Sequence, residues 1–386
     1  MVQIPFNKPF CVGKELYYMA QAVMVDSHIS GDGRFTRLCH QWLEQRLNGQ
    51  KAFLTHSCTA ALEMAAILCD LQPGDEVIMP SFTFVSTANA FVLRGAVPVF
   101  VDIRQDNLNI DERVIESAVT DRTKAVVPVH YAGVACDMDA IMSIAESKQL
   151  IVIEDAAQAL LSTYKNAYLG TVGHFGCLSF HETKNVISGE GGALLVNQPE
   201  FAERAEIIRE KGTNRSKFFR GEIDKYSWVD LGSSFLPSEL IAAFLYAQLE
   251  HAEHINRTRR IIFDRYYSEL QPLARSGHIR LPFISEECSS NGHLFYIITR
   301  SPEERSGLIE SLKSNGVHAI FHYVPLHSSQ AGRKFGKVAG PMTVTDDLSE
   351  RIVRLPLYYA MTPEEVDRVV ELIWNFYKPQ AGQNGR

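Results

Sequence analysis

The stretch "LIVIEDAAQAL" (residues 150–160) joins a short apolar strand to the start of a helix. Four apolar residues lead into Glu154 and Asp155, so the carboxylate of Asp155 stands where the expected strand ends. A buried carboxylate costs free energy unless a cationic or protonated group meets it. The stretch therefore indicates either a binding site at Asp155 or a residue that finishes the strand and caps the helix. Taken alone, the pattern favours the second, structural interpretation.

Three further segments have the composition of short buried strands. They are rich in Val and Ile, are separated by helix-length segments such as a helix expected over about residues 59–70, and cover residues 76–80, 97–102 and 124–130. This alternation predicts βαβ crossovers and a mostly parallel sheet, hence an α/β fold. Ligands of such sheets bind at the carboxyl ends of the strands. The stretches "PSFTFVST", "HYAG" and "EDAAQAL" follow three of these ends.

The pattern changes after residue 250. A charged helical stretch leads to "LFYIITR" (294–300), a helix near 302–314, the extended segment "VHAIFHY" (317–323) and a last helix near 363–378. We therefore expect two domains. The large one covers residues 1–250 and includes an N-terminal arm, and the small α+β one covers residues 251–386.

The composition excludes several classes of protein. A formal net charge of −7 over 386 residues disfavours non-specific nucleic-acid binding, which needs a basic face. The seven cysteines are scattered and form no C-x-x-C pair, so neither a disulfide framework nor a metal site is expected, and a reducing cytoplasm is the simplest location. Prolines and charges interrupt the apolar segments, which predicts neither a signal peptide nor a membrane span.

The stretch "SCTAAL" (57–62) places small polar residues at the start of a helix. The first backbone N–H groups of a helix have no intrahelical acceptor, so this position is suited to binding a phosphate group. The simpler alternative is ordinary N-capping by Ser57 or Thr59.

The stretch "SFHETKNVISGEGG" (179–192) contains Lys184 between an aromatic-histidine segment and a glycine-rich turn. A lone lysine near glycines is most often a surface residue. Combined with Asp155 and the helix start at 57–62, however, Lys184 completes the requirements of pyridoxal 5′-phosphate (PLP). That cofactor needs a lysine for a Schiff base, a carboxylate for its ring nitrogen and a phosphate site. Phe84 in "PSFTFVST" supplies an aromatic ring to stack on it.

Together these motifs resemble the DegT/DnrJ/EryC1/StrS family of sugar aminotransferases. The shared motifs are "SCTAAL", "PSFTF", "EDAAQ", "SFHETKNVISGEGG" and "YVPLH", and the resemblance runs from about residue 11 to residue 366. The family's first motif is matched only loosely, by "GDGRFTRLCHQW". The resemblance implies a PLP-dependent enzyme with the type I (aspartate aminotransferase) fold.

The family's residue roles can be carried over to matching positions. The resemblance implies that Lys184 forms the Schiff base and moves protons, that Asp155 pairs with the pyridinium nitrogen, and that Gln158 lies near the 3-oxygen of the ring. It further implies contacts to the cofactor's phosphate and ring, by Thr59, Ala60, Ser179 and Phe84.

One position departs from the family pattern. Many members carry an asparagine in G-x-N-x-R that reaches the phosphate from the neighbouring subunit. This chain has "GSSFL" (232–236), with Ser234 in place of the asparagine and Leu236 in place of the arginine. The resemblance thus implies a homodimer in which Ser234 makes this contact across the interface.

The finer resemblance concerns the substrate. "SFHETKN", "EKGTNRSKFFRGEIDKYSW" and "LGSSFLPSE" are most similar to members that aminate C4 of dTDP-4-keto-6-deoxyglucose with L-glutamate as donor. The product expected from this similarity is dTDP-4-amino-4,6-dideoxygalactose, of O-antigen (lipopolysaccharide) and enterobacterial-common-antigen pathways. The gluco epimer and a non-catalytic sugar-nucleotide-binding relative remain alternatives. A sugar 3-dehydratase is disfavoured, because those relatives have histidine where this chain has Lys184.

Substrate contacts are expected from basic and histidine residues. The basic segment 209–220 either receives the nucleotide, through Arg215 and Arg220, or is a solvated loop. His181 lies close to Lys184 in sequence and either acts on the sugar or packs as a structural histidine. His327 in "YVPLH" is expected at the mouth of the site.

Overall fold

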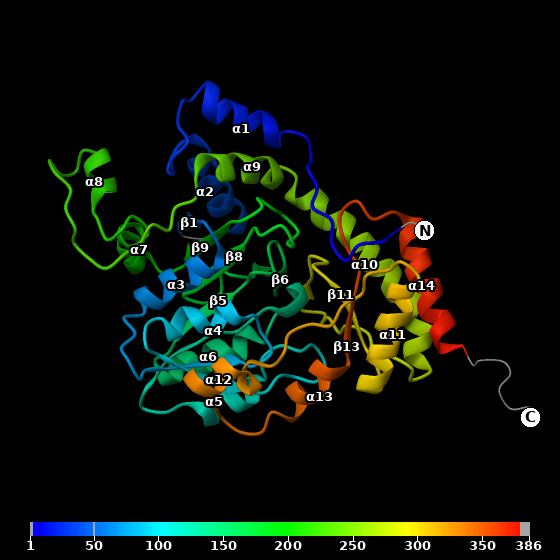
Figure 1. The fold of residues 1–386 in the computed structure, drawn as a ribbon. Helices are drawn as coiled ribbons and strands as arrows, with labels where there is room; N and C mark the ends of the chain where they lie inside the picture. Colours follow the sequence, from blue (N-terminus) through cyan, green and yellow to red (C-terminus); the bar gives the residue numbers. More distant parts are fainter. Residues whose placement is uncertain (1–2, 49–50, 379–386) are drawn as a thin grey trace, which may run out of the picture.

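The computed structural model describes residues 3–48 and 51–378 and contains one large sheet with helices on both faces (Figure 1). In spatial order its eight strands are β1 (Lys51–Thr55), β9 (Gly192–Val196), β8 (Phe175–Ser179), β5 (Ile151–Asp155), β4 (Thr123–Val126), β2 (Glu76–Pro80), β3 (Val97–Val101) and β12 (Lys337–Val338). Strand β9 is antiparallel to both of its neighbours, and the other neighbouring pairs are parallel. The predicted mostly parallel sheet is confirmed.

The four strands predicted from sequence form as β2 to β5. Only β4 is clearly shorter than expected, because it ends at Val126 instead of continuing to residue 130. Pro128 follows two residues later and has no N–H to donate to a neighbouring strand. The carbonyl of Pro128 still accepts from the N–H of Asp155 at 2.9 Å, which holds the end of β5 beside this segment.

Nine helices accompany the large sheet in the described residues up to Leu249. They are α1 (Glu15–Met24), α2 (Arg34–Leu47), α3 (Cys58–Leu68), α4 (Val85–Val92), α5 (Ile115–Ala118), α6 (Met138–Lys148), α7 (Ala202–Arg209), α8 (Arg215–Phe219) and α9 (Glu239–Leu249). Successive strand residues face opposite sides, so Ile78 packs with α2, α6 and α9, while Val77 and Met79 pack with α3, α4 and α7. The helix expected near 59–70 forms as α3.

The C-terminal part has its own core. Strands β11 (Phe295–Ile298) and β13 (Ile352–Leu355) form an antiparallel pair that packs with α10 (Ala252–Arg275), α11 (Pro302–Ser314) and α14 (Pro363–Tyr377). The helices predicted near 302–314 and 363–378 are confirmed. The segment 317–323 makes only single bridges, to Ile4 and Arg354, and instead supplies residues that line a cavity.

The remaining elements are short. They are the three-stranded sheet β10 (Cys288–Ser289), β6 (Thr163–Tyr164) and β7 (Ala167–Tyr168), the helices α12 (Gln330–Phe335) and α13 (Thr343–Arg351), and the 3-10 turns η1 (Glu112–Val114), η2 (Tyr131–Gly133), η3 (Pro199–Phe201) and η4 (Leu326–Ser328). Because β12 returns to the edge of the large sheet, beside β3, part of the C-terminal region packs on the N-terminal core. A division at residues 250 and 251 stays a prediction.

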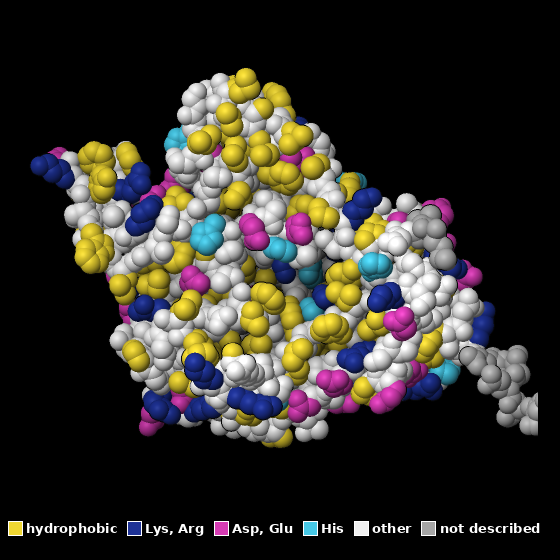
Figure 2. Space-filling view, in the orientation of Figure 1, with side chains coloured by type: hydrophobic (Ala, Val, Ile, Leu, Met, Phe, Trp, Pro, Cys, Tyr) yellow, Lys and Arg dark blue, Asp and Glu magenta, His cyan; other side chains and the backbone are white. Residues whose placement is uncertain are grey.

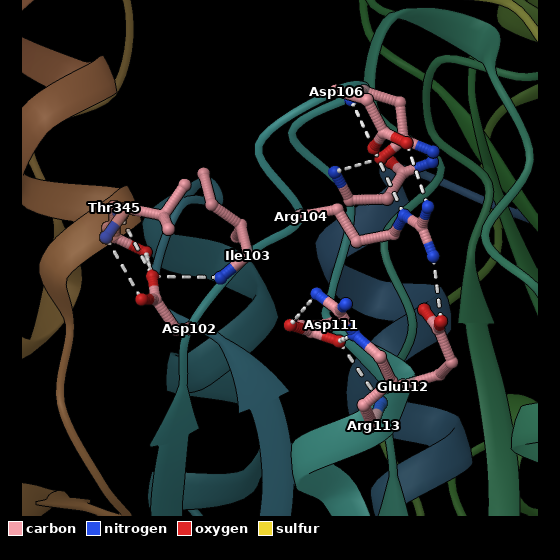
Figure 3. Close-up of polar contacts among 11 residues, drawn as sticks. Asp102, Ile103, Arg104, Asp106, Asp111, Glu112, Arg113 and Thr345 are labelled. Carbon is pink, nitrogen blue, oxygen red and sulfur yellow. Dashed lines mark hydrogen bonds and ion pairs between the residues drawn. The ribbon is translucent and has the colours of Figure 1, made fainter.

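Asp102 joins the end of β3 to α13 (Figure 3). Its carboxylate accepts from the backbone N–H groups of Val344 and Thr345, at 3.0 and 2.8 Å, and from the Thr345 hydroxyl at 2.6 Å. The loop that follows Asp102 is held by ion pairs of Arg104 with Asp106 and Glu112. The start of α13 is thus capped by a residue of the large sheet.

The N-terminal arm connects the two parts of the molecule (Figure 1). The N–H of Ile4 donates to Gly316 at 2.9 Å, and its carbonyl accepts from His318 at 3.0 Å, so the arm begins against the C-terminal part. Helix α1 then packs against α9 on the large part. Among the described helices, none combines the length and apolar composition that a membrane crossing requires.

Candidate active site

A cavity of about 920 Å³ lies where the carboxyl ends of β5 and β8 meet the C-terminal part. Figure 2 shows a hollow near the centre of one face, with Lys or Arg and His side chains inside it. The cavity is lined from both parts of the chain, by Asp155, Ser179 and Lys184 on one side and by residues 320–324 and Arg354 on the other. The structure therefore brings together Lys184 and Asp155, which are far apart in sequence.

Asp155 ends β5 with its carboxylate in this cavity. One oxygen accepts from the Thr87 hydroxyl at 2.7 Å, and the other accepts from the N–H of Ala157 at 3.2 Å. Thr87 is itself hydrogen-bonded to Thr83 at 2.9 Å, and both threonines are buried. No ion pair of Asp155 occurs among the described residues. Its negative charge is thus available to a cationic ligand.

Lys184 lies in the loop that connects β8 to β9. Backbone hydrogen bonds hold this loop, from Phe180 to Gly191 at 2.8 Å and from Lys184 to His181 at 2.9 Å. Burial lowers the pKa of the Lys184 ammonium, the charge of Arg354 lowers it further, and the charges of Cys58 and Asp155 oppose the shift. A lowered pKa favours the neutral amine, which is the nucleophilic form.

The N-terminus of α3 faces the same cavity. Ser57 caps the helix by accepting from the N–H of Ala60 at 3.1 Å, and the Thr59 hydroxyl donates to Ser86 at 2.8 Å. Ser57, Thr59, Ser86 and Ser179 all line the cavity. A helix N-terminus surrounded by hydroxyl groups suits an anionic phosphate. N-capping and phosphate binding are compatible at this stretch, since Ser57 caps the helix while the helix N-terminus still faces the cavity.

The loop that carries Lys184 is packed directly on this helix start. A Cβ built on Gly192 would lie 2.4 Å from the carbonyl carbon of Ser57 and from the backbone nitrogen of Cys58. Real Cβ atoms do not approach backbone so closely, so only glycine fits at position 192. The first residue of β9 is therefore in backbone contact with the start of α3.

Gln158 and Phe84 lie at the wall of the cavity. The Gln158 side chain accepts from the N–H of Ala132 at 2.7 Å and donates to the Tyr323 hydroxyl at 2.8 Å. Phe84 is 57% exposed, and its ring centroid lies 6.3 Å from that of Tyr323. Both expected residues are thus at the cavity, with the Phe84 ring largely uncovered.

His181 also lines the cavity, in a partly exposed position. Its Nδ1 is 2.9 Å from the Thr183 hydroxyl, and its Nε2 is 3.7 Å from a carboxylate oxygen of Glu190. This arrangement places His181 at the entrance beside Lys184. Its position is compatible with contact to a sugar and with a structural role through Thr183 and Glu190.

Other expected residues do not line the cavity. Ala60 lies in the first turn of α3 and is buried, with its N–H bonded to Ser57. The structure corrects the expectation for His327, because its ring is held between Ser81 at 2.7 Å and Asp346 at 3.2 Å. Ser57, by contrast, lines the cavity and was expected only as a cap.

Ser234, expected at the subunit interface, and the two arginines expected to bind the nucleotide also lie away from this cavity. Ser234 is exposed and is bridged to Glu210. Arg215 pairs with Glu210 at 3.4 Å, and Arg220 pairs with Glu206 at 2.8 Å. These residues belong to the segment around α8, which projects from the molecule in Figure 1. These three side chains therefore do not contribute to the cavity of their own chain. A contribution to the partner subunit's cavity stays a prediction.

Sequence reasoning missed several residues of the cavity wall. Phe6 and Asn7 come from the N-terminal arm, and His322 and Arg354 come from the C-terminal part. One signal was present for Arg354, since a lone cation stands inside the apolar run "IVRLPL" (352–357). No comparable signal marks Phe6 or Asn7, because only the folded chain brings the arm to the cavity.

Comparison with known proteins agrees with this geometry. The DegT/DnrJ/EryC1/StrS aminotransferase family model matches residues 11–374. The spore coat polysaccharide biosynthesis protein SpsC of Bacillus subtilis is 34% identical over 340 residues, which cover 86% of this chain and 87% of that protein.

Solved structures agree as well. The aminotransferase TlmJ of Streptoalloteichus hindustanus superposes with a TM-score of 0.89 at 27% identity, covering 97% of this chain and 99% of TlmJ. The putative sugar aminotransferase Spr1654 of Streptococcus pneumoniae was solved in a PMP form and a PLP form. The PMP form superposes with a TM-score of 0.89 at 27% identity and the PLP form with 0.87 at 26% identity, and each match covers 97% of this chain and 98% of Spr1654. The chain therefore belongs to the DegT/DnrJ/EryC1/StrS aminotransferase family, and it is a PLP-dependent sugar aminotransferase of the type I fold.

Proposed function

We propose that this enzyme transfers the amino group of L-glutamate to C4 of dTDP-4-keto-6-deoxy-D-glucose and forms dTDP-4-amino-4,6-dideoxygalactose. One observation carries the catalytic part of the proposal: Lys184 and Asp155 line one cavity beside a hydroxyl-rich helix N-terminus. The sugar is supported by the similarity of the stretches around residues 179–185, 210–228 and 231–239 to C4 transaminases.

The residues of the cavity fit PLP. Asp155 has only neutral partners in the structure, so its charge is free to pair with the cofactor's ring nitrogen. Thr59 and Ser179 are placed to hold the phosphate, with Ser57 and Ser86 beside them. Phe84 would stack on the ring, and Gln158 would lie at its 3-oxygen. Bound PLP withdraws electrons from the substrate carbon that exchanges a proton.

Lys184 has two tasks in this proposal. Its neutral amine would hold the cofactor covalently, and its Nζ would accept the proton that leaves the Cα of the amino acid. The cavity favours the neutral amine, because burial lowers the pKa of Lys184. Asp155, oriented by Thr87, keeps its charge directed at the ring nitrogen. His181, at the entrance, is the proposed contact to the sugar.

We also propose a homodimer. The support is a set of exposed apolar side chains on and after α1, namely Leu16, Tyr17, Val23, Met24, Val25 and Ile29. Contiguous exposed apolar surface of this kind marks an interface. Ser234, Arg215 and Arg220 would then act at the partner's site, on its phosphate and nucleotide.

The proposed setting is sugar-nucleotide metabolism in the cytoplasm, feeding O-antigen or enterobacterial-common-antigen assembly. The seven cysteines support a reducing compartment, since all of them are unpaired in the structure.

The product of the reaction tests the proposal. The protein is incubated with PLP, L-glutamate and dTDP-4-keto-6-deoxyglucose, and the product is analysed by NMR. Small couplings between H4 and its neighbours identify the axial amine of the galacto product, whereas large couplings identify the gluco epimer. Lys184→Ala is the matched control, and it should abolish both turnover and the yellow absorbance of the bound cofactor. An absence of any aminated sugar from the wild-type protein would show that its substrate is a different sugar.

A further inference from the structure

Arg354 is placed on the cavity by the alternation of strand β13. Its neighbours Val353 and Leu355 are fully buried in the C-terminal core, so the residue between them faces the opposite way. Its backbone is hydrogen-bonded in both directions to Ile320, which fixes its position on the strand. Arg354 therefore presents its side chain to the cavity from a rigid element.

The guanidinium of Arg354 has few partners. Its Nε donates to the carbonyl of Phe321 at 3.3 Å, and its central carbon lies 4.7 Å from the centroid of the Phe6 ring. Neither terminal nitrogen has a hydrogen-bond acceptor, and no carboxylate pairs with it, among the described residues. A partly buried guanidinium is normally paired with an anion or with several carbonyls.

Two other buried arginines show what a structural arginine looks like in this protein. Arg259 donates to the carbonyls of Gly292, His293 and Leu357. Arg209 donates to a carbonyl and pairs with Asp32 at 2.7 Å. Arg354 has no such set of partners, so a purely structural role leaves its terminal nitrogens unexplained.

The charge around Arg354 is unbalanced. The carboxylates that line the cavity belong to Asp155 and Glu190. Asp155 is assigned to the cofactor's ring nitrogen, and the Glu190 side chain is 66% exposed beside His181. The positive charge of Arg354 also contributes to the lowered pKa values of Lys184 and His322. An anion at Arg354 would balance this charge close to the reacting amine.

From these contacts we infer that Arg354 binds a carboxylate of the amino-acid donor. The inference rests on the proposed function, which supplies the donor as L-glutamate. A guanidinium receives a carboxylate through two parallel hydrogen bonds, and the free terminal nitrogens of Arg354 are the donors required. The other anion of the reaction, the diphosphate of the sugar nucleotide, is separated from C4 by the sugar ring, so it belongs farther from Lys184.

The test is the first half of the reaction, in which glutamate reacts with the PLP enzyme and no sugar is present. Loss of the lysine-bound cofactor's absorbance is followed in a stopped-flow instrument for wild type, Arg354→Gln and Arg354→Lys. Arg368→Gln removes a cation from the exposed face of α14 and is the matched control. We expect Arg354→Gln to raise the glutamate concentration for half-maximal rate about 10- to 100-fold, the loss typical of a charged hydrogen-bonded contact. Arg354→Lys should recover part of it, and the control should match wild type.

Binding of glutarate to the apoprotein gives a readout that does not depend on turnover. Glutarate has two carboxylates and no amine, and calorimetry should show weaker binding to Arg354→Gln than to wild type. Equal glutarate affinity, or a defect confined to the second half-reaction with the sugar nucleotide, would overturn the inference and point to the diphosphate. The half-reaction with glutamate and the glutarate titration both omit the sugar, so a wrong sugar assignment leaves these two measurements intact. If wild type failed to react with glutamate, the proposed donor would be wrong, and the calorimetry would still decide whether Arg354 binds carboxylates.

Discussion

Lys184 and Asp155 experience different surroundings although they line one cavity. Burial disfavours the ammonium form of Lys184 and lowers its pKa. Asp155 is stabilised by donated hydrogen bonds from Thr87 and Ala157. Burial thus favours the neutral amine of Lys184, and the two hydrogen bonds fix the orientation of the Asp155 carboxylate.

The pH dependence of stability should report the lowered pKa of Lys184. Between its folded pKa and the ordinary value of 10.5, the unfolded chain binds more protons than the folded one, so the free energy of unfolding rises with pH. Lys184→Met lacks this pH-dependent contribution to the free energy of unfolding. We therefore expect the apoprotein of Lys184→Met to be more stable than wild type at pH 7, by a margin that shrinks towards pH 10. Urea unfolding at several pH values measures it, with the exposed Lys313→Met as control. A margin that does not change with pH would contradict the expectation.

Thr87 is expected to position Asp155. Thr87→Val preserves the shape of the side chain but removes the donor to the carboxylate, which loses about 1–3 kcal/mol where the acceptor is buried. We expect weaker PLP binding by absorbance titration and a lower melting temperature of the holoenzyme. Thr87→Ser keeps the hydroxyl and should restore the cofactor affinity. If valine and serine behaved alike, packing alone would explain the role of Thr87.

Helix α13 depends on a cap from outside its own sequence. Its first residues have no N-cap side chain that bonds their N–H groups, and Asp102 at the end of β3 supplies the acceptors instead (Figure 3). The arrangement couples the edge of the large sheet to the strand that carries Arg354, because β13 follows α13 directly. Loss of this cap should therefore affect both stability and the cavity.

Asp102→Ala should lower the free energy of unfolding by about 1–3 kcal/mol, because it leaves several donors without an acceptor. Asp106→Ala is the matched comparison in the same loop, since it removes a partly exposed ion pair with Arg104 and should cost at most about 1 kcal/mol. Urea unfolding of both variants measures the difference. Equal losses would show that the contacts to α13 add nothing beyond a surface ion pair.

The elements that sequence predicted well are those with a strong local signal. Strands β2, β3 and β5 and helices α3, α11 and α14 were predicted nearly to the residue, because apolar periodicity and capping residues mark them. Lys184 and Asp155 were also predicted to share one site, through spacing and family resemblance, and both line the cavity. What escaped prediction depends on distant parts of the chain. Phe6 reaches the cavity only because Ile4 pairs with residues 316 and 318, and the cap of α13 lies some 240 residues away from it in sequence.

The molecule has a group of exposed apolar side chains on α1 and the residues that follow it. Helix α1 and the residues after it expose Leu16 by 73% and Met24 by 81%, and Figure 2 shows hydrophobic side chains gathered over this region. The segment around α8 adds Phe219 and Trp228, which are also exposed. A solvent-exposed surface of this kind is costly for a monomer. The proposed homodimer would cover it.

Charge introduced on α1 should disrupt the dimer. We expect wild type to sediment as a dimer and the double variant Leu16→Glu, Met24→Glu to sediment as a monomer at micromolar concentration. Ile261→Glu on α10 is the control, because Ile261 is exposed to a similar degree away from α1. The control should remain dimeric. A wild-type protein that sediments as a monomer, or a double variant that stays dimeric, would show that α1 is not the interface.

The absence of a side chain at position 192 has a consequence for how this site can change over time. The first residue of β9 rests against the peptide between Ser57 and Cys58, so the distance between this strand and the start of α3 is set by backbone thickness alone. The start of β9 and the start of α3 therefore have to move together. A methyl group added there should push the two apart and enlarge the gap that the cofactor has to span. We therefore expect substitutions that alter substrate specificity to occur in other parts of the cavity wall, such as the arm and β13. The contact between Gly192 and the start of α3 should stay unchanged.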